Sequence, residues 1–174
     1  MLKTRQPAPE MSFPLVTGGR WTLAERKPDA LSMVVAYRGL HCPQCRNYLQ
    51  ELNGKMEDFA GRGVDVVAVS SDGRERAMAA KTDWDLAKLP IAYDLAIEKA
   101  RELGLAISTS RGKTSIGIEE PALFNEPGLF LMKPDATLYA AFLQTTPFAR
   151  PPLDQLLKAI DFIKEKGYPA RGEA

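Results

Sequence analysis

Two continuous apolar segments stand out along the chain, and each predicts a buried β-strand. Residues 31–37 (LSMVVAY) and 64–70 (VDVVAVS) are rich in β-branched residues and carry few charges. A strand that is covered on both faces has such a continuous run rather than an alternating one. We therefore expect both segments at the centre of a sheet.

Other apolar residues recur at three- and four-residue spacing, which is typical of helices that bury one face. This pattern predicts a helix over residues 43–60 and a closing helix over residues 152–166. Two shorter helices are expected over residues 73–81, with Asp72 as the cap, and over residues 95–103. Helices that alternate with strands in this order indicate βαβ units on a parallel sheet.

Short apolar runs around turn residues predict two β-hairpins. Residues 13–23 (FPLVTGGRWTL) contain two such runs about a Gly-Gly pair. Residues 128–132 and 137–143 flank a Lys-Pro-Asp-Ala turn and form the second hairpin. Residues 89–93 are expected to add a short strand.

In two segments the apolar residues do not recur at a regular spacing. Residues 105–127 carry Ser, Thr, Gly and Pro and predict a long surface loop, a kind of loop that is often functional. Residues 1–12 are polar and contain Pro, so we expect an N-terminal arm before a single domain over residues 13–174.

Composition and charge narrow the class of protein. The chain has 174 residues, 45% of them hydrophobic, which suits one globular domain. Its 23 Lys and Arg nearly balance 22 Asp and Glu, so the chain has no excess positive charge that would attract nucleic acid or anionic lipid. The chain start lacks the apolar core of a secretory signal, and no apolar run is long enough for a membrane helix. We therefore expect a cytoplasmic protein.

The two cysteines of the chain are Cys42 and Cys45, separated by Pro and Gln. They lie where the strand over residues 31–37 gives way to the helix over residues 43–60, which is where a C-x-x-C redox dithiol occurs in a βαβ unit. Only a thiolate is a nucleophile, and an ordinary thiol is mostly protonated at neutral pH. The spacing and position therefore favour a redox dithiol.

The start of a helix favours the thiolate over the thiol, because its free N–H groups and dipole stabilise an anion. Pro43, as the first helical residue, gives up no hydrogen bond. We expect Cys42 to be the attacking thiol, and Cys45, one turn into the helix and less exposed, to be the resolving thiol. The alternative is that both cysteines are unreactive and only pack in the core.

A zinc site is disfavoured because the single histidine, His41, is adjacent to Cys42 and badly placed to join it. His41 could instead lower the pKa of Cys42 as a cation, contact a substrate, or pack at the surface. Two further motifs are interpreted as solvated surface: residues 111–115 (RGKTS), and the acidic pair Glu119 and Glu120.

Residues 37–45 (YRGLHCPQC) after a hydrophobic strand resemble the active-site segment of the thioredoxin-fold superfamily. The resemblance is closest to the peroxiredoxin-like branch of the alkyl hydroperoxide reductase and thiol-specific antioxidant (AhpC/TSA) family. It implies an α/β, thioredoxin-like fold with a central mixed β-sheet flanked by helices and an N-terminal β-hairpin. It also implies that Pro127, before residues 128–132, takes the role of the superfamily's cis-proline beside the cysteines.

Arg150, just before the closing helix, resembles the family arginine beside the peroxidatic cysteine, although a solvent-facing arginine is an equal alternative. Two family patterns are missing. Peroxiredoxins carry P-x-x-x-[TS]-x-x-C, whereas Val35 and Gly39 occupy these positions here. Thioredoxins carry Asp and Trp where this chain has Ala36 and His41.

Three functions remain open. We favour a thiol-disulfide oxidoreductase in which Cys42 attacks a disulfide and Cys45 releases the product. The alternative is a peroxidase in which peroxide oxidises Cys42 to a sulfenic acid that Cys45 resolves. The third is a non-catalytic redox sensor or binding module. The catalytic readings imply no metal or organic cofactor, an external thiol reductant and, in some such folds, a homodimer.

Overall fold

The protein was analysed as a computed structural model that describes residues 2–174. Its strands are β1 (Ser12–Pro14), β2 (Arg20–Thr22), β3 (Leu31–Ala36), β4 (Val64–Val69), β5 (Ile91–Ala92), β6 (Ile107–Thr109), β7 (Leu123–Asn125), β8 (Gly128–Met132) and β9 (Leu138–Leu143). Its helices are α1 (Pro43–Gly54), α2 (Met56–Gly61), α3 (Arg74–Asp83), α4 (Ile97–Glu102) and α5 (Leu153–Lys166), with a short 3-10 helix, η1 (Leu23–Glu25).

A five-stranded sheet in the order β5-β4-β3-β8-β9 forms the centre of the molecule. Strands β3, β4 and β5 run parallel, as the predicted βαβ units require, and β8 and β9 are antiparallel to their neighbours. The sheet is therefore mixed, and the predicted α/β, thioredoxin-like architecture is confirmed. In β3, Val34 lies between Val67 of β4 and Phe130 of β8.

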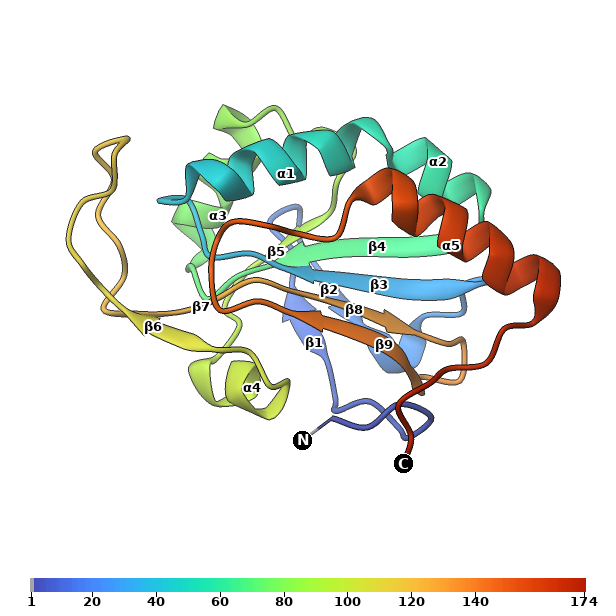
Figure 1. The fold of residues 1–174 in the computed structure, drawn as a ribbon. Helices are drawn as coiled ribbons and strands as arrows, with labels where there is room; N and C mark the ends of the chain where they lie inside the picture. Colours follow the sequence, from blue (N-terminus) through green and yellow to red (C-terminus); the bar gives the residue numbers. More distant parts are fainter. Residues whose placement is uncertain (1) are drawn as a thin grey trace.

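Each face of the sheet buries its own apolar core. Helices α1, α2 and α5 cover one face with α3, and the β1–β2 hairpin and α4 cover the other (Figure 1). Successive residues of β3 divide between these cores: Met33 and Val35 join the first, Val34 and Ala36 the second. A strand buried on both faces explains why its sequence is continuously apolar.

Most predicted elements are present, but the predicted helix over residues 43–60 is two helices. Gly54 ends α1, and Lys55 leaves helical geometry with φ −103° and ψ 7°. The Lys55 N–H donates to Leu52 O at 3.0 Å, three residues back rather than the four of an α-helix. Glycine is a poor helix former, so the break falls where the helix is weakest. Periodicity alone does not detect such a break because the apolar spacing continues through it.

The predicted loop over residues 105–127 contains secondary structure, which corrects that expectation. β6 and β7 pair as an antiparallel hairpin, with Ile107 opposite Asn125 and Thr109 opposite Leu123. Each strand has three residues, which is too short for an apolar period to show. This hairpin extends away from the sheet beside the start of α1 (Figure 1).

Asp72 does not cap the helix that follows it, contrary to the prediction. Gly73 takes the cap position of α3 and makes no side-chain cap. The Asp72 carboxylate accepts instead from the Leu40 N–H at 2.7 Å and from Arg76 Nε at 2.9 Å. It therefore fixes the segment that leads into the cysteines.

The predicted N-terminal arm pairs with the edge strand. The Arg5 N–H donates to Leu138 O and the Ala8 N–H to Ala136 O, both at 2.9 Å. Arg5 Nε also donates to Ala170 O, so the two ends of the chain lie side by side (Figure 1). The boundary that we place at residue 12 between arm and domain stays a prediction.

Candidate active site

Cys42 is the residue at which α1 begins. Its backbone is extended, with φ −104° and ψ 104°, and Pro43 is the first helical residue. The Cys42 Sγ accepts the Cys45 N–H at 3.2 Å, so the sulfur takes one of the free amide groups at the helix start. A thiolate at this place is stabilised by that N–H and by the helix dipole.

The two thiols lie against each other beneath the surface. Cys45 Sγ donates to Cys42 Sγ at 2.6 Å, and both cysteines are free. We expected Cys42 to be the more exposed of the two, but both residues are 0% exposed. The reason is that both cysteines are part of the first core.

The two sulfurs differ in acidity. The hydrogen bond from the Cys45 thiol lowers the pKa of Cys42 to about 6; burial opposes this shift, and the Cys45 N–H, Arg150 and Arg38 add to it. Burial raises the pKa of Cys45 well above its ordinary value, and donation to Cys42 raises it further. The geometry therefore suits Cys42 as the thiolate and Cys45 as the protonated thiol.

Arg150 reaches the dithiol from the loop before α5. Its Nη2 donates to Cys45 Sγ at 3.0 Å, and that sulfur lies 2.6 Å from Cys42 Sγ. Arg150 therefore lies beside the dithiol rather than in solvent. Nε and Nη1 of the same guanidinium are buried and make no hydrogen bond within residues 2–174. The guanidinium also lies over the Tyr48 ring, 5.3 Å from its centroid.

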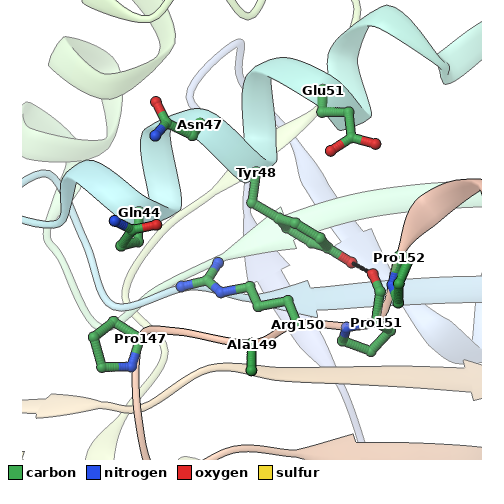
Figure 2. A pocket seen from close by; sticks show the side chains of 9 residues that line it. All are labelled: Gln44, Asn47, Tyr48, Glu51, Pro147, Ala149, Arg150, Pro151 and Pro152. Carbon is green, nitrogen blue, oxygen red and sulfur yellow. Dashed lines mark hydrogen bonds between the residues drawn. The ribbon is translucent and has the colours of Figure 1, made fainter.

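A pocket of about 240 Å³ opens between α1 and this loop. Figure 2 shows Arg150 extending from the loop toward the start of α1, while the Tyr48 side chain points to the prolines on the other side. The Tyr48 hydroxyl donates to Pro151 O at 2.8 Å and so ties the loop to the helix. The pocket is lined by Gln44, Asn47, Tyr48, Glu51, Pro147, Ala149, Arg150, Pro151 and Pro152.

His41 is buried and neutral, so neither its surface packing nor its role as a cation near Cys42 holds. It is 0% exposed, and its ring packs edge-on against Phe124 at 4.7 Å. Burial, with the charges of Arg38 and Arg76, lowers the pKa of His41 to about 4. A histidine with this pKa carries no charge at neutral pH.

Pro127 joins β7 to β8, and its peptide bond is trans. Every described peptide bond, over residues 2–174, is trans, so the cis-proline that the resemblance implied is not found there. The Pro127 carbonyl accepts the Gln144 N–H at 3.0 Å. The residue next to the active-site segment is Asn125, which donates to Tyr37 O and accepts from the Ser71 N–H, both at 3.0 Å.

The sequence analysis missed a buried ion cluster on the other side of the dithiol. Arg38 Nε lies 3.2 Å from Glu126 Oε2, and Arg38 Nη2 lies 3.6 Å from Glu120 Oε1. Glu120 was predicted to be solvated but is only 9% exposed. Its partner precedes it by more than 80 positions, so no local pattern could have indicated the pair. The predicted solvation of residues 111–115 holds, since none of them is buried.

Gly39 occupies a backbone conformation that suits glycine, with φ +134°. A Cβ atom at this position would lie 2.6 Å from Asp72 Oδ2. The position three residues before Cys42 therefore has no room for a hydroxyl side chain. Any hydrogen bond to a substrate must come from another group.

The described residues, 2–174, contain no cluster of three or more His, Cys, Asp or Glu that could hold a metal ion. Among the same residues, no helix combines the length and apolar character needed to cross a membrane.

A family model for the AhpC/TSA family matches residues 4–141, which is most of the chain. This chain belongs to the AhpC/TSA family. The resemblance of the segment around Cys42 is thereby confirmed at the level of the family. A comparison with curated proteins returned no match.

Solved structures with the same fold include several peroxiredoxins. Peroxidoxin BcpB from Mycobacterium tuberculosis is 18% identical, with a TM-score of 0.72 over 94% of this AhpC/TSA chain and 99% of its own. A mutant of peroxiredoxin 6 from Arenicola marina is 19% identical, with a TM-score of 0.74 over 96% and 76%. A hypothetical protein from Sinorhizobium meliloti 1021 is 22% identical, with a TM-score of 0.69 over 98% and 88%. At these identities the likeness concerns the fold.

Proposed function

We propose that this protein is a thiol peroxidase in which Cys42 is the peroxidatic thiol and Cys45 the resolving thiol. The observation that carries the proposal is the acidified Cys42 at the start of α1, fully buried and 2.6 Å from its partner sulfur. A buried sulfur admits a small peroxide more readily than a disulfide, which must align three sulfur atoms. Membership of the AhpC/TSA family favours the same substrate.

The first step is attack of the Cys42 thiolate on one oxygen of the peroxide. The O–O bond breaks, an S–O bond forms, and the leaving oxygen takes a proton to become water or an alcohol, so that Cys42 is now a sulfenic acid. Arg150 has two buried donors without a hydrogen-bond partner, and these could stabilise the leaving oxygen in place of the missing threonine.

The second step is attack of Cys45 on the Cys42 sulfenic acid. The S–S bond forms, and the hydroxyl leaves with the Cys45 proton as water. The raised pKa of Cys45 supports this order because the thiol keeps its proton until it reacts. An external dithiol then reduces the Cys42–Cys45 disulfide and is itself oxidised, so no other cofactor is needed. A homodimer stays a prediction.

The deciding experiment compares two rates in the fully reduced protein. We expect hydrogen peroxide to oxidise Cys42 orders of magnitude faster than it oxidises a free thiolate, and a small aromatic disulfide to react no faster than with that free thiolate. The opposite result would favour the disulfide reductase, which the C-x-x-C spacing supports. Slow reaction with both oxidants would favour a redox sensor.

Single replacements test the roles of the two cysteines. Cys42→Ser should abolish turnover, because the nucleophile is lost. Cys45→Ser should react once with peroxide and then stop, with the mass of the Cys42 peptide increased by one oxygen. Full turnover by Cys42→Ser would show that the nucleophile is assigned wrongly.

A further inference from the structure

Arg38 lies between the dithiol and the base of the β6–β7 hairpin, and two buried carboxylates face it. Its guanidinium approaches Glu126 at 3.2 Å and Glu120 at 3.6 Å and covers the Phe124 ring at 4.8 Å. Glu126 is 3% exposed. We call Arg38, Glu120 and Glu126 the Arg38 cluster.

Both carboxylates are also held by contacts of their own. Ser108 Oγ donates to Glu126 Oε1 at 2.6 Å, and the Arg111 N–H donates to Glu120 Oε2 at 2.7 Å. Burying a carboxylate is costly unless it is paired, and one guanidinium needs a single carboxylate for charge balance. The second acid therefore gives the Arg38 cluster a formal excess of negative charge.

Arg38 joins this cluster to the reacting sulfurs. The backbone N–H of Arg38 donates to Cys45 Sγ at 3.4 Å, and the charge of its guanidinium lowers the pKa of Cys42. At His41, the residue before Cys42, Arg38 and Glu120 act in opposite directions: Arg38 lowers the pKa and Glu120 raises it. The charge of Glu120 thus reaches His41, the residue before Cys42.

Other ionisable groups face the dithiol from neighbouring elements. Arg150, from the loop before α5, contacts Cys45 and has no carboxylate partner among the described residues. Asp72 and Arg76 offset each other at 2.9 Å, and His41 is neutral. Burial raises the pKa of Tyr37, which is therefore neutral too. The thiolate thus lies between a free cation and an acidic cluster.

We propose that Glu120 and Glu126 are positioning residues that act on Cys42 through Arg38, offsetting its charge so that the thiolate stays more basic. The intrinsic nucleophilicity of a thiolate falls as its pKa falls. The two acids would therefore limit how far Arg38 lowers the pKa of Cys42, so that the thiolate keeps more of its nucleophilicity while it is still populated at neutral pH. The proposal depends on the proposed function only for Cys42 as the nucleophile.

The test is the pH dependence of alkylation by iodoacetamide in the reduced protein, with the modified cysteine identified by mass spectrometry. Glu126→Gln keeps the shape of the side chain and removes its charge. It should lower the pH midpoint of Cys42 by about 0.5 unit, and Glu120→Gln should act in the same direction. Arg38→Met should raise the midpoint.

Glu119→Gln is the matched control, because Glu119 is an exposed neighbour on the same hairpin and carries the same charge. Its midpoint should not move. A midpoint in Glu126→Gln and Glu120→Gln that is unchanged, or that rises, would overturn the proposal and leave the acids as structural partners of Arg38. Circular dichroism identifies a variant that fails to fold. In that case the alkylation midpoint of the other acid variant decides whether the proposal holds.

This experiment uses no peroxide, so it separates the two proposals. A shifted midpoint in a protein without peroxidase activity would support the role of the acids and reject only the proposed substrate. The alkylation rate of Glu126→Gln at its high-pH plateau should also be about 1.5-fold lower than that of the wild type.

Discussion

The Cys42 sulfur gains its acidity from hydrogen bonds made within one helical turn. The Cys45 thiol and the Cys45 N–H both donate to it, whereas the neighbouring His41 contributes no charge. Adjacency in sequence suggested a histidine cation, but burial against Phe124 removes that charge. The cysteine spacing predicted this contact, because both donors come from Cys45 itself. Arg38 and its acids could not be predicted, because their pairing depends on the folded hairpin.

The pH profile of Cys42 follows from its lowered pKa of about 6. An ordinary thiol titrates near pH 8.5, so lowering the pKa extends the reactive thiolate to lower pH. The alkylation rate of the wild-type protein should be nearly constant above about pH 7 and fall about tenfold per unit below about pH 5. A midpoint near pH 8.5 would contradict the geometry of the helix start.

Replacing Arg150 tests its contact with the dithiol. Arg150→Met removes the donor to Cys45 Sγ and a cation that lowers the pKa of Cys42. We expect the midpoint of Cys42 to rise by about one pH unit and the rate with hydrogen peroxide to fall about 10-fold or more. Arg46→Met removes an exposed arginine of α1 and should change neither quantity. Equal effects of the two variants would reject the specific role of Arg150.

At the scale of elements, the site depends on how α1 is joined to segments remote in sequence. Tyr48 links it to the loop before α5, and Asn125 of β7 links the segment before it to Ser71, two residues after β4. The apolar patterns predicted the elements themselves, including α5 and the β8–β9 hairpin. The β6–β7 hairpin was missed because three-residue strands show no period. The patterns could not predict the hydrogen bonds that connect these elements, because each is a single polar contact between residues remote in sequence.

The link from Tyr48 to the loop can be measured directly. Tyr48→Phe keeps the ring under Arg150 and removes the hydrogen bond to Pro151 O. It should lower the free energy of unfolding by about 1 kcal/mol in urea denaturation. Tyr93→Phe, outside this contact, serves as the control. A Tyr48→Phe protein as stable as the wild type would mean that the loop is held by its prolines alone.

At the scale of the whole molecule, one sheet carries a core on each face, and the dithiol lies in the first core, just after the central strand β3. Continuous apolar strands made this architecture predictable, since a strand such as β3 must be covered on both faces. The depth of the cysteines was not predictable, because it depends on residues remote in sequence that join the same core, such as Leu129 and Leu153.

The buried His41 predicts a loss of stability in acid. Its folded pKa of about 4 lies below the unfolded value of about 6.5, so between these values the unfolded chain binds a proton that the folded protein does not. The contribution of His41 to stability is therefore fully present above about pH 6.5 and is lost as the pH falls toward 4, by at most about 1 kcal/mol per unit. Urea denaturation across this range should show a steeper loss of stability in the wild type than in His41→Gln. Parallel slopes would place the histidine in contact with water.

The glycine three residues before Cys42 also limits the mutational routes open to this chain. A threonine at that position would need both a different backbone angle and the space of the Asp72 carboxylate, 2.6 Å from the new Cβ. Asp72 in turn holds Leu40 and Arg76, so it cannot be shortened without releasing the turn. Acquiring the peroxiredoxin threonine would thus take at least two coordinated substitutions with an impaired intermediate. Libraries that vary position 39 alone should return few folded proteins, so glycine is expected to persist at this position.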